Sequence, residues 1–321
     1  NSNRRIEAVE GFGLVELTRI LSKDSFSSLH KLESLDIQDL PRLERFDSDA
    51  LARNYVLRSI SVQTWPHIEK YRFRLGLIIS SVPSLRSLSV KVLEAHLNDQ
   101  LLGSSPSFLT ELKITGSSLK KLEPRALTGL GRSRALTIRI HETQIEDLPP
   151  GLFASLVQIP VLSLDLVNNR LSSLSPASLY SNATSWESIG TKLLTGGLVL
   201  EKNPWACDCG LVWLGHWLRR WLREALQIHT VSLETAQQLQ EMVRRATCLD
   251  PRTNQRTPLI ELYPHRLSCH ASALSREARP PGGATSSSRP SALSSSSSSH
   301  ASGGPFPEFP PKYCRTVDRI N

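Results

Sequence analysis

The stretch Asn203-Pro204-Trp205-Ala206-Cys207-Asp208-Cys209 decides the interpretation of this chain. It places two cysteines one residue apart, and two further cysteines, Cys248 and Cys269, follow singly. Between the second and third cysteines runs an apolar helical pattern that carries Trp213, Trp217 and Trp221. We interpret Asn203–Cys269 as a cap that closes the end of the fold before it.

The four cysteines of this stretch fit a disulfide framework better than a zinc site. A structural zinc site takes four ligands that usually arrive as two close pairs, whereas only Cys207 and Cys209 are close here. These two are too near to bond comfortably to each other, so each is expected to pair with a distant cysteine. Four cysteines allow three connectivities, and spacing alone does not choose among them. Buried free thiols in a cytosolic protein are the alternative.

The pattern Asn-Pro-Trp-x-Cys-x-Cys, followed by a Trp/Leu helix and two single cysteines, resembles the C-terminal cysteine-rich flank of extracellular leucine-rich-repeat proteins. The resemblance covers roughly Leu32–Cys269 and extends to adhesion and receptor ectodomains such as Slit, Toll-type receptors and chaoptin-like molecules. It implies the disulfides Cys207–Cys248 and Cys209–Cys269. Disulfides belong to an oxidising compartment, so the expected location is extracellular or at the cell surface. No cysteine precedes Cys207, so the N-terminal cysteine-rich flank of that family is not found in this sequence. Either the solenoid starts upstream of Asn1 or this protein caps that end in another way.

Seven units of the pattern L-x-x-L-x-L precede the cysteine-rich stretch. Most steps between them are 24 to 28 residues, inside the leucine-rich range of roughly 20–29. One unit cannot bury its apolar strand positions and the second apolar row of its returning segment alone, so neighbours stack and share a core. The second row includes Phe26, Leu51, Leu127 and Phe153. The anchors are Leu32-Leu35-Ile37, Leu57-Ile60-Val62, Leu85-Leu88-Val90, Leu109-Leu112-Ile114, Ala135-Ile138-Ile140, Val161-Leu164-Leu166 and Thr195-Leu198-Leu200.

These features predict an α/β fold: a leucine-rich-repeat solenoid (horseshoe) with a disulfide-bonded C-terminal cap and a disordered tail. The expected domains are residues 1–200 for the solenoid, with about 7–8 irregular repeats, residues 201–270 for the cap, and residues 271–321 for a Ser/Pro-rich tail or stalk. A degenerate first unit is expected near Ala8.

The repeats depart from the asparagine ladder that normally satisfies backbone groups at each turn. Asparagine occupies the ladder position only at Asn169 and Asn203. We therefore expect the other units to bend differently at that point. The residues that replace asparagine are Leu40, Trp65, Leu93, Ser117 and Thr143.

One helix of the cap has two distinct faces. Its apolar face, expected to cover the last repeat, contains Leu211, Leu214, Leu218 and Leu222 at helical spacing, joined by Trp217 and Trp221. The opposite face carries the basic patch Arg219, Arg220 and Arg223. That patch is either an ordinary solvated face or a contact for an anionic partner.

A second candidate surface is the concave side of the strands, to which the residue between the last two apolar positions of each unit should point. This column suits a protein ligand with complementary charges, although ordinary solvated charge on an exposed sheet is the alternative. One end of the surface is acidic, with Glu33 and Asp39 in the adjacent slots beside Gln38. The middle is basic, with Arg58, Arg86 and Lys91. The column itself runs Asp36, Ser61, Ser89, Lys113, Arg139, Asp165 and Val199.

Two further motifs concern covalent modification. The segment Tyr180–Thr195 is an insertion in the last unit and contains the sequon Asn182-Ala183-Thr184, an expected glycosylation site. Cys314, in the tail, is the odd cysteine. It is a free thiol, an intermolecular bridge, or one half of a pair whose partner lies outside this chain.

No catalytic constellation is found. The chain lacks G-x-S-x-G, H-E-x-x-H, a Gly-rich phosphate loop and C-x-x-C. Its nine histidines are scattered, and His265 and His270 flank Cys269 without a third zinc ligand nearby. We therefore expect no enzyme activity, no metal and no cofactor.

By the resemblance, the expected function is extracellular recognition of a protein ligand or adhesion partner on the concave face. The alternative is a secreted matrix-type protein that binds anionic polysaccharide, such as a glycosaminoglycan, or matrix components through its basic surface; the net charge is +8. Basic residues without interleaved aromatics argue against nucleic acid. No run of eighteen apolar residues exists, so membrane attachment is expected only through a segment outside this chain.

Overall fold

The computed structural model describes residues 19–267, except for positions 39, 41, 70–73, 104–107, 131, 157, 180–196 and 229–232. All of these residues belong to the first of two compact units, Asn1–Leu274. The expected first repeat near Ala8 and the tail lie outside the described residues.

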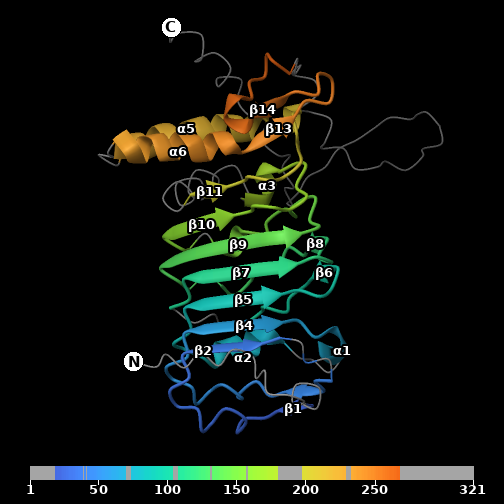
Figure 1. The fold of residues 1–321 in the computed structure, drawn as a ribbon, viewed down its shortest axis with the longest axis vertical. Helices are drawn as coiled ribbons and strands as arrows, with labels where there is room; N and C mark the ends of the chain where they lie inside the picture. Colours follow the sequence, from blue (N-terminus) through green and yellow to red (C-terminus); the bar gives the residue numbers. More distant parts are fainter. Residues whose placement is uncertain are drawn as a thin grey trace, which may run out of the picture. The chain divides into compact units, whose positions relative to one another are not determined.

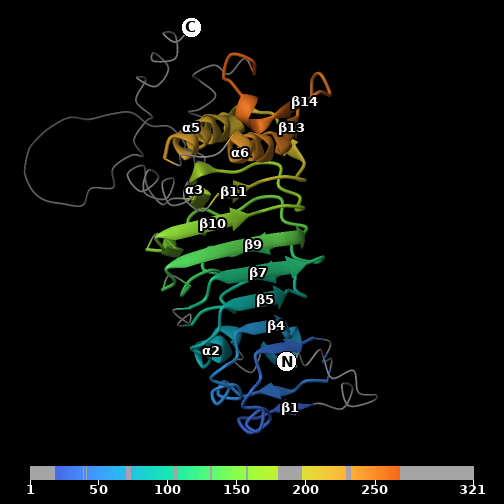
Figure 2. The ribbon, with the colours of Figure 1, turned by 60° about the vertical axis from the view of Figure 1, so that its left-hand side comes forward.

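A seven-stranded, all-parallel sheet organises this unit (Figure 1). Its strands follow one another in chain order, so each repeat adds one strand beside the previous one (Figure 2). This arrangement confirms the predicted leucine-rich-repeat solenoid. The strands are β2 (Ser34–Ile37), β4 (Ser59–Gln63), β5 (Ser87–Lys91), β7 (Glu111–Gly116), β9 (Ala135–Thr143), β10 (Val161–Asp165) and β11 (Leu198–Val199).

The register of the sheet aligns the predicted anchors. The middle apolar position of every repeat pairs with the same position of the next, in the order Leu35, Ile60, Leu88, Leu112, Ile138, Leu164 and Leu198. The first anchors of two repeats are different from the expectation, because Ala135 and Val161 are exposed and Leu136 and Leu162 are buried instead. Relative to the middle anchor, strands β9 and β10 begin earlier than β2, β4, β5 and β7. Side chains alternate between the two faces of a strand, so in β9 and β10 the residue two positions before the middle anchor, Leu136 or Leu162, faces the core.

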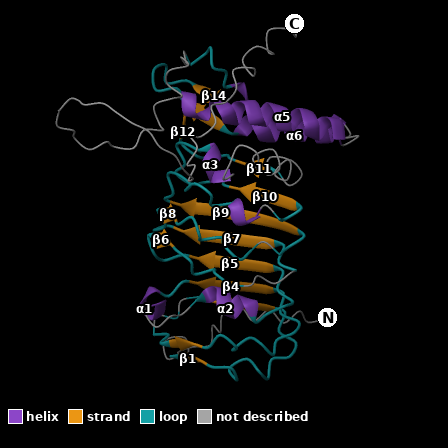
Figure 3. Cartoon of the chain, turned by 180° about the vertical axis from the view of Figure 1, so that it is seen from behind, coloured by secondary structure: helices purple, strands orange, loops and turns teal. Residues whose placement is uncertain are grey.

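The other elements of the solenoid lie away from this sheet. Two short parallel pairs join β1 (Ile20–Leu21) to β3 (Arg45–Phe46) and β6 (His96–Leu97) to β8 (Lys121–Leu122). The short helices, seen from the other side of the sheet in Figure 3, are α1 (Pro66–Glu69), α2 (Leu75–Ser80), η1 (Ala154–Leu156) and α3 (Pro176–Leu179). One face of the sheet, toward the viewer in Figure 1, is thus left without a described helix over β4 to β10. We call it the open face.

The apolar core is continuous from the first described repeat to the cap. The second apolar row is as predicted, since Leu51, Leu127 and Phe153 are buried and Phe26 packs against the cluster. The same cluster includes Leu211, Leu214 and Trp217 of the cap. The cap therefore extends the core beyond the last repeat and shields it from water.

The asparagine ladder is present at the C-terminal end of the solenoid. Asn169 donates through Nδ2 to the carbonyl oxygens of Ile140 (2.7 Å) and Leu166 (2.9 Å). Its Oδ1 accepts from the backbone N–H (3.2 Å) and the hydroxyl (2.7 Å) of Thr143. Asn203 repeats the pattern one unit later, with Nδ2 2.7 Å from the Leu166 oxygen.

Thr143 corrects one expectation about the ladder. It was expected to mark a unit that bends differently, but it joins the ladder and accepts from the N–H of Ile145 at 3.3 Å. The residues before Thr143, Asn169 and Asn203 all have positive φ, at 55° (Glu142), 60° (Asn168) and 55° (Lys202). The three turns therefore share one backbone conformation.

The cap combines a small sheet with two helices. Strand β12 (Trp205–Ala206) pairs in parallel with β13 (Thr247–Leu249), which pairs antiparallel with β14 (Arg256–Pro258). The helical segments are η2 (Cys209–Leu211), α5 (Val212–Ile228), α6 (Leu233–Arg245) and η3 (Leu259–Glu261). No helix within the described residues is both long and apolar enough to cross a membrane.

Helix α5 lies very close to η3. A Cβ added to Gly215 would be 2.6 Å from the carbonyl oxygen of Leu259 and 2.9 Å from that of Leu262. Only glycine allows this approach at that position of α5.

Candidate functional site: the open sheet face and the cap

The predicted concave column lies in a single row across the open face. Register pairs connect each member to the next on the adjacent strand. Lys113 is exposed and the other members are half-buried. The row consists of Asp36, Ser61, Ser89, Lys113, Arg139, Asp165 and Val199.

Arg139 is held by its neighbours on the open face. Its guanidinium forms an ion pair with Glu111 and lies 3.8 Å from Asp165. Asp165 Oδ1 is also 2.9 Å from Nε2 of His141. We call Glu111, Arg139, His141 and Asp165 the paired network. Arg139 is already paired with two carboxylates, so it presents less positive charge to a ligand than its sequence position suggests.

Sequence reasoning did not place Glu111 and His141 at this surface. The signal that could have found them is the two-residue alternation of the strands. Glu111 and Lys113 share one face of β7, and Arg139 and His141 share one face of β9. Alternation predicts which residues share a face, but it does not predict which of them form pairs across repeats.

Four other exposed cations, two on the open face and two at the starts of its strands, have no ion pair among the described residues. Arg58 and Arg86 directly precede β4 and β5, and the backbone N–H of Arg86 donates to the Arg58 oxygen at 2.8 Å. Lys91 ends β5, and Lys113 lies in β7 opposite Ser89. We call these four residues the basic band.

Acidic residues precede the basic band. Glu33 is exposed, and its carbonyl oxygen accepts from the backbone N–H of Arg58 at 2.8 Å. Asp36 lies opposite Ser61, whose hydroxyl accepts from Gln38 at 2.8 Å. We call Glu33 and Asp36 the acidic margin. Asp39, also expected here, lies outside the described residues.

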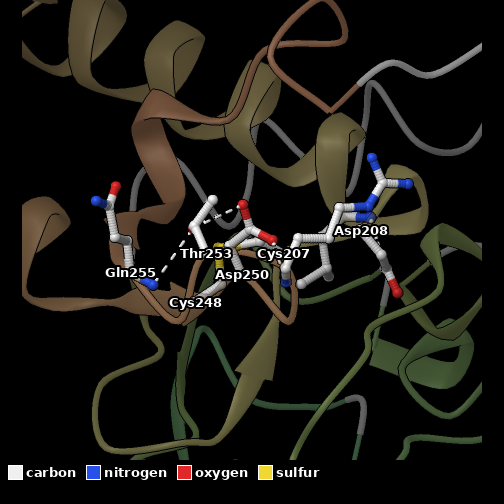
Figure 4. The surroundings of a disulfide bond; sticks show 8 residues. Cys207, Asp208, Cys248, Asp250, Thr253 and Gln255 are labelled. Atoms are coloured by element: carbon white, nitrogen blue, oxygen red, sulfur yellow. Dashed lines mark hydrogen bonds between the residues drawn. A yellow bond between two sulfur atoms is a disulfide. The ribbon is translucent and has the colours of Figure 1, made fainter.

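The cap is closed by a disulfide between Cys207 and Cys248, with Cα atoms 5.1 Å apart (Figure 4). Each cysteine lies at a cap strand, and the backbone N–H of Cys207 donates to the Leu249 oxygen at 3.0 Å. The side chain of Asp208 accepts from the N–H of Leu211 at 3.1 Å and so caps η2. The Cys207–Cys248 disulfide is one of the two pairs that the resemblance implied. Its loss is expected to lower the free energy of unfolding by about 2–5 kcal/mol.

The turn between β13 and β14 is organised by one carboxylate. Asp250 accepts from the backbone N–H of Arg252 at 2.9 Å and from the hydroxyl of Thr253 at 3.0 Å (Figure 4). These hydrogen bonds, with the one from Arg252 contributing most, lower the pKa of Asp250. The turn positions Gln255, whose N–H donates to the Thr253 hydroxyl at 3.4 Å.

The structure separates the three arginines of the predicted basic patch. Arg219 donates through Nη1 to the carbonyl oxygens of Ile260 (2.5 Å) and Leu262 (3.0 Å), and its guanidinium lies 4.1 Å from the Tyr263 ring centroid. Burial lowers the pKa of Arg219. Arg220 forms an ion pair with Glu224 at 2.6 Å. Arg223 is exposed. Arg219 is thus a structural residue that fastens α5 to η3.

The cap also bonds to the last repeats through tryptophan side chains. Trp213 donates from Nε1 to the Leu174 oxygen at 3.0 Å, and Trp205 donates to the Leu200 oxygen at 2.9 Å. The backbone N–H of Ala206 donates to the Ser172 oxygen at 3.0 Å. These bonds attach the cap to the two final units.

Several predicted sites lie outside the described residues, namely Asn182, Cys269, His270 and Cys314. Cys209 is disulfide-bonded, and its pairing with Cys269 stays a prediction. Within the described part of the chain, no group of three or more His, Cys, Asp or Glu side chains could hold a metal ion.

Stacked parallel strands, a partial asparagine ladder and a disulfide-bonded cap define a leucine-rich-repeat solenoid with a C-terminal cysteine-rich cap. No family model matches the chain. A rat protein, leucine-rich repeat and fibronectin type-III domain-containing protein 4, is 35% identical over 113 residues, which are 35% of this chain and 17% of the rat protein. Chaoptin from Tribolium castaneum is 24% identical over 206 residues, which are 64% of this chain and 25% of chaoptin.

Among solved structures, human 5T4 (Wnt-activated inhibitory factor 1, trophoblast glycoprotein) is 19% identical, with a TM-score of 0.49 over 77% of this chain and 83% of 5T4. The chain spans at most a quarter of the length of the two curated relatives. These relatives are leucine-rich-repeat proteins, as the resemblance predicted. The Cys207–Cys248 disulfide is typical of an oxidising compartment, in agreement with the expected location outside the cell or at its surface.

Proposed function

We propose that this chain is a non-enzymatic recognition module, part of the ectodomain of a cell-surface adhesion or receptor protein, and that it binds a protein ligand on the open face of the sheet. The observation that carries the proposal is the in-register row of side chains across seven adjacent strands, with no described helix over β4 to β10. An extended array of this kind can contact a partner at many points without rearrangement, since each strand is held by its two neighbours.

A glycan placed on the open face tests this proposal. Thr115→Asn completes a sequon with Gly116 and Ser117 on β7, on the same face as Lys113. The full chain, secreted and joined into oligomers to raise avidity, would be tested against a panel of extracellular proteins displayed on cells. We expect binding to at least one of them, and loss of that binding when the β7 glycan is attached.

A matched control places the same modification elsewhere. Gln255→Asn completes a sequon with Arg256 and Thr257 in the exposed β13–β14 turn of the cap. This variant should keep the binding of the unsubstituted chain. Binding that survives the glycan on β7, in a variant shown by mass spectrometry to be glycosylated, would contradict the proposal.

An anionic polysaccharide remains the competing ligand. Of the three arginines predicted to bind it, Arg219 and Arg220 make contacts within the cap, and Arg223 is exposed. Retention of the chain on heparin that is lost in Arg223→Ala but kept in glycosylated Thr115→Asn would favour this alternative over the protein ligand.

A further inference from the structure

The open face carries charge in a definite order along the solenoid. The acidic margin comes first, the basic band follows on β4, β5 and β7, and the paired network occupies β7, β9 and β10. The zones differ in the charge that is available to a partner, because only the paired network has ion pairs among its own members.

The basic band is the zone with the largest unpaired charge. Its four cations are exposed: Lys91 and Lys113 lie on β5 and β7, and Arg58 and Arg86 directly precede β4 and β5. The neighbouring side chains of these strands on the open face are serines, Ser59 and Ser61 on β4 and Ser87 and Ser89 on β5, which are too short to cover the cations. The band therefore offers four long, exposed cations beside hydroxyl groups, and carboxylates are the groups that such cations bind.

The acidic margin lies one strand away from the band but does not neutralise it. Glu33 and Arg58 are neighbours through their backbones, and yet no ion pair joins them. One carboxylate oxygen of Asp36, Oδ1, is buried and has no hydrogen-bond partner among the described residues. Neither Glu33 nor Asp36 forms an ion pair within the described part of the chain, so a cationic ligand would not have to displace one.

The paired network contributes little further attraction. Glu111 and Asp165 both contact Arg139, and Asp165 also lies against His141. A ligand would have to break these contacts to gain new ones. Selectivity by charge is therefore concentrated in the margin and the band.

From this order we infer that the ligand of the open face is a protein segment of patterned charge, with a run of carboxylates against Arg58, Arg86, Lys91 and Lys113 and cationic side chains next to Glu33 and Asp36. The inference rests on the proposed function and specifies its partner. A uniformly anionic polymer fits less well, because any stretch that covered the band and ran on across β2 would meet the two carboxylates of the margin, and like charges at an interface are repulsive.

The spacing of the strands sets the spacing of the ligand's charges. Adjacent strands lie about 4.8 Å apart, so the acidic margin at β2 is about 5 Å from β4, where the basic band begins. An extended peptide rises about 3.3 Å per residue. The ligand's cations and the start of its acidic run should therefore be separated by roughly one or two residues when the segment crosses the strands.

Synthetic peptides test this pattern directly. The probe has two lysines, one glycine and four glutamates in that order, and a second peptide contains the same residues with the lysines placed inside the glutamates. Binding of the full chain to each immobilised peptide would be measured by biolayer interferometry at low salt, together with polyglutamate and a heparin fragment. We expect the ordered probe to bind roughly fivefold or more tightly than the reordered peptide, and its affinity to fall steeply with salt.

Charge reversal locates the binding. In the double variant Arg58→Glu with Arg86→Glu, affinity for the ordered probe should fall roughly tenfold or more, since two attractive contacts become repulsive. A charge-inverted probe, with glutamates and lysines exchanged, should bind this variant better than it binds the unsubstituted chain. The matched control reverses two exposed cations outside the seven-stranded sheet, Lys120→Glu with Arg125→Glu, and should change the affinity less than about twofold.

The outcomes separate this inference from the proposed function. The inference is overturned when the reordered peptide, polyglutamate or heparin binds as tightly as the ordered probe, or when reversal at Arg58 and Arg86 has no more effect than the control. If the peptides fail in this way while the glycan on β7 still abolishes binding to a cell-surface protein, the proposed function stands with a different partner chemistry. If that glycan has no effect, the proposed function itself fails.

Discussion

The repeats on the two sides of β7 stack their turns in different ways. In the C-terminal repeats, Thr143, Asn169 and Asn203 occupy equivalent positions, each after a residue with φ of 55° to 60°. The ladder continues between them, because Oδ1 of Asn203 accepts from the N–H of Asn169 at 3.2 Å. The amides of Asn169 and Asn203 and the hydroxyl of Thr143 thus satisfy backbone groups at these three turns.

No such ladder is found among the described residues of the N-terminal repeats. Trp65 fills the corresponding position and packs edge-to-face on Phe46, with ring centroids 5.9 Å apart. Thr64 takes over part of the asparagine's role, since its hydroxyl accepts from the N–H of Leu93 at 2.9 Å and donates to Glu94. Several buried oxygens find no partner within the described residues, namely Asn54 Oδ1, Gln63 Oε1, Glu94 Oε1 and Gln100 Oε1.

Close backbone contact accompanies the missing ladder. A Cβ on Gly103 would lie 2.5 Å from the carbonyl oxygen of Gly76, and a Cβ on Gly129 would overlap the oxygen of Gly103. These three glycines form a column through successive repeats. The comparison teaches that a ladder of side chains bridges the turns in the C-terminal half, whereas in the N-terminal half direct backbone contact between glycines adds to isolated amide bonds such as those of Asn54 to the Phe26 and Leu29 oxygens.

The largest expected effect comes from breaking the glycine column. Gly129→Ala adds a Cβ that collides with backbone and also places alanine at φ 99°. Overpacking and left-handed strain should together lower the free energy of unfolding by about 3–5 kcal/mol. Urea unfolding followed by circular dichroism would measure it.

Gly151→Ala is the matched control for this substitution. Gly151 also has positive φ, 74°, but a Cβ there would meet nothing within 4 Å. Its substitution should cost only the backbone strain, about 1–2 kcal/mol. Equal losses in the two variants would show that backbone contact does not hold the N-terminal repeats together.

The second prediction concerns the ladder itself. Asn169→Leu removes four hydrogen bonds and leaves the buried oxygens of Ile140 and Leu166 and the N–H of Thr143 without this partner. We expect a loss of about 2–3 kcal/mol in the free energy of unfolding, measured by the same urea titration.

Gln63→Met provides the comparison in the N-terminal half. Gln63 is also buried, but its Oε1 has no partner within the described part of the chain, so replacement by a similarly shaped apolar side chain should change stability by less than about 1 kcal/mol. If Gln63→Met proved as costly as Asn169→Leu, the two halves would not differ in the way described.

The sequence predicted the repeated part of this fold, but it did not predict the features that differ from one repeat to another. All seven strands follow from apolar residues that alternate within each unit, because alternation determines which side chains face the core. Helix α2 and the glycine column were not predicted, since they depend on how closely two turns approach in space. The equivalence of Thr143 and asparagine was also missed, because it rests on backbone conformation and not on residue type.

The candidate sites show the same division. The row on the open face was predicted residue by residue, because its members repeat with the strands. The pairing of Arg139 with Glu111 was not predicted, because these residues lie 28 positions apart in the chain. Similarly, helical spacing placed Arg219 on a surface, whereas its bonds to Ile260 and Leu262 join residues more than 40 positions apart.

The cap yields the third prediction, which tests whether this end depends on Arg219. Arg219→Ala removes a cation that bonds two carbonyl oxygens and should lower the stability by about 1–2 kcal/mol, reduced from the usual value for charged hydrogen bonds because the side chain is only half-buried. Arg223→Ala, one turn further along α5 and exposed, should change it by less than about 0.5 kcal/mol. Differential scanning fluorimetry would measure both, and equal effects would rule out the structural role of Arg219.

The smallest expected effect is a dependence of the cap on pH through His216. Partial burial of the imidazole, followed by the charges of Arg219, Arg220 and Arg223, lowers the pKa of His216 below its ordinary value of 6.5. The unfolded chain therefore binds the proton more readily than the folded chain, so this residue's contribution to stability is fully present above pH 6.5 and is lost as the pH falls from 6.5 through the folded-state pKa. We expect the melting temperature to fall between pH 7.5 and pH 5.5, and to fall less in His216→Gln. An equal fall in both chains would mean that the acid-sensitive groups are residues other than His216.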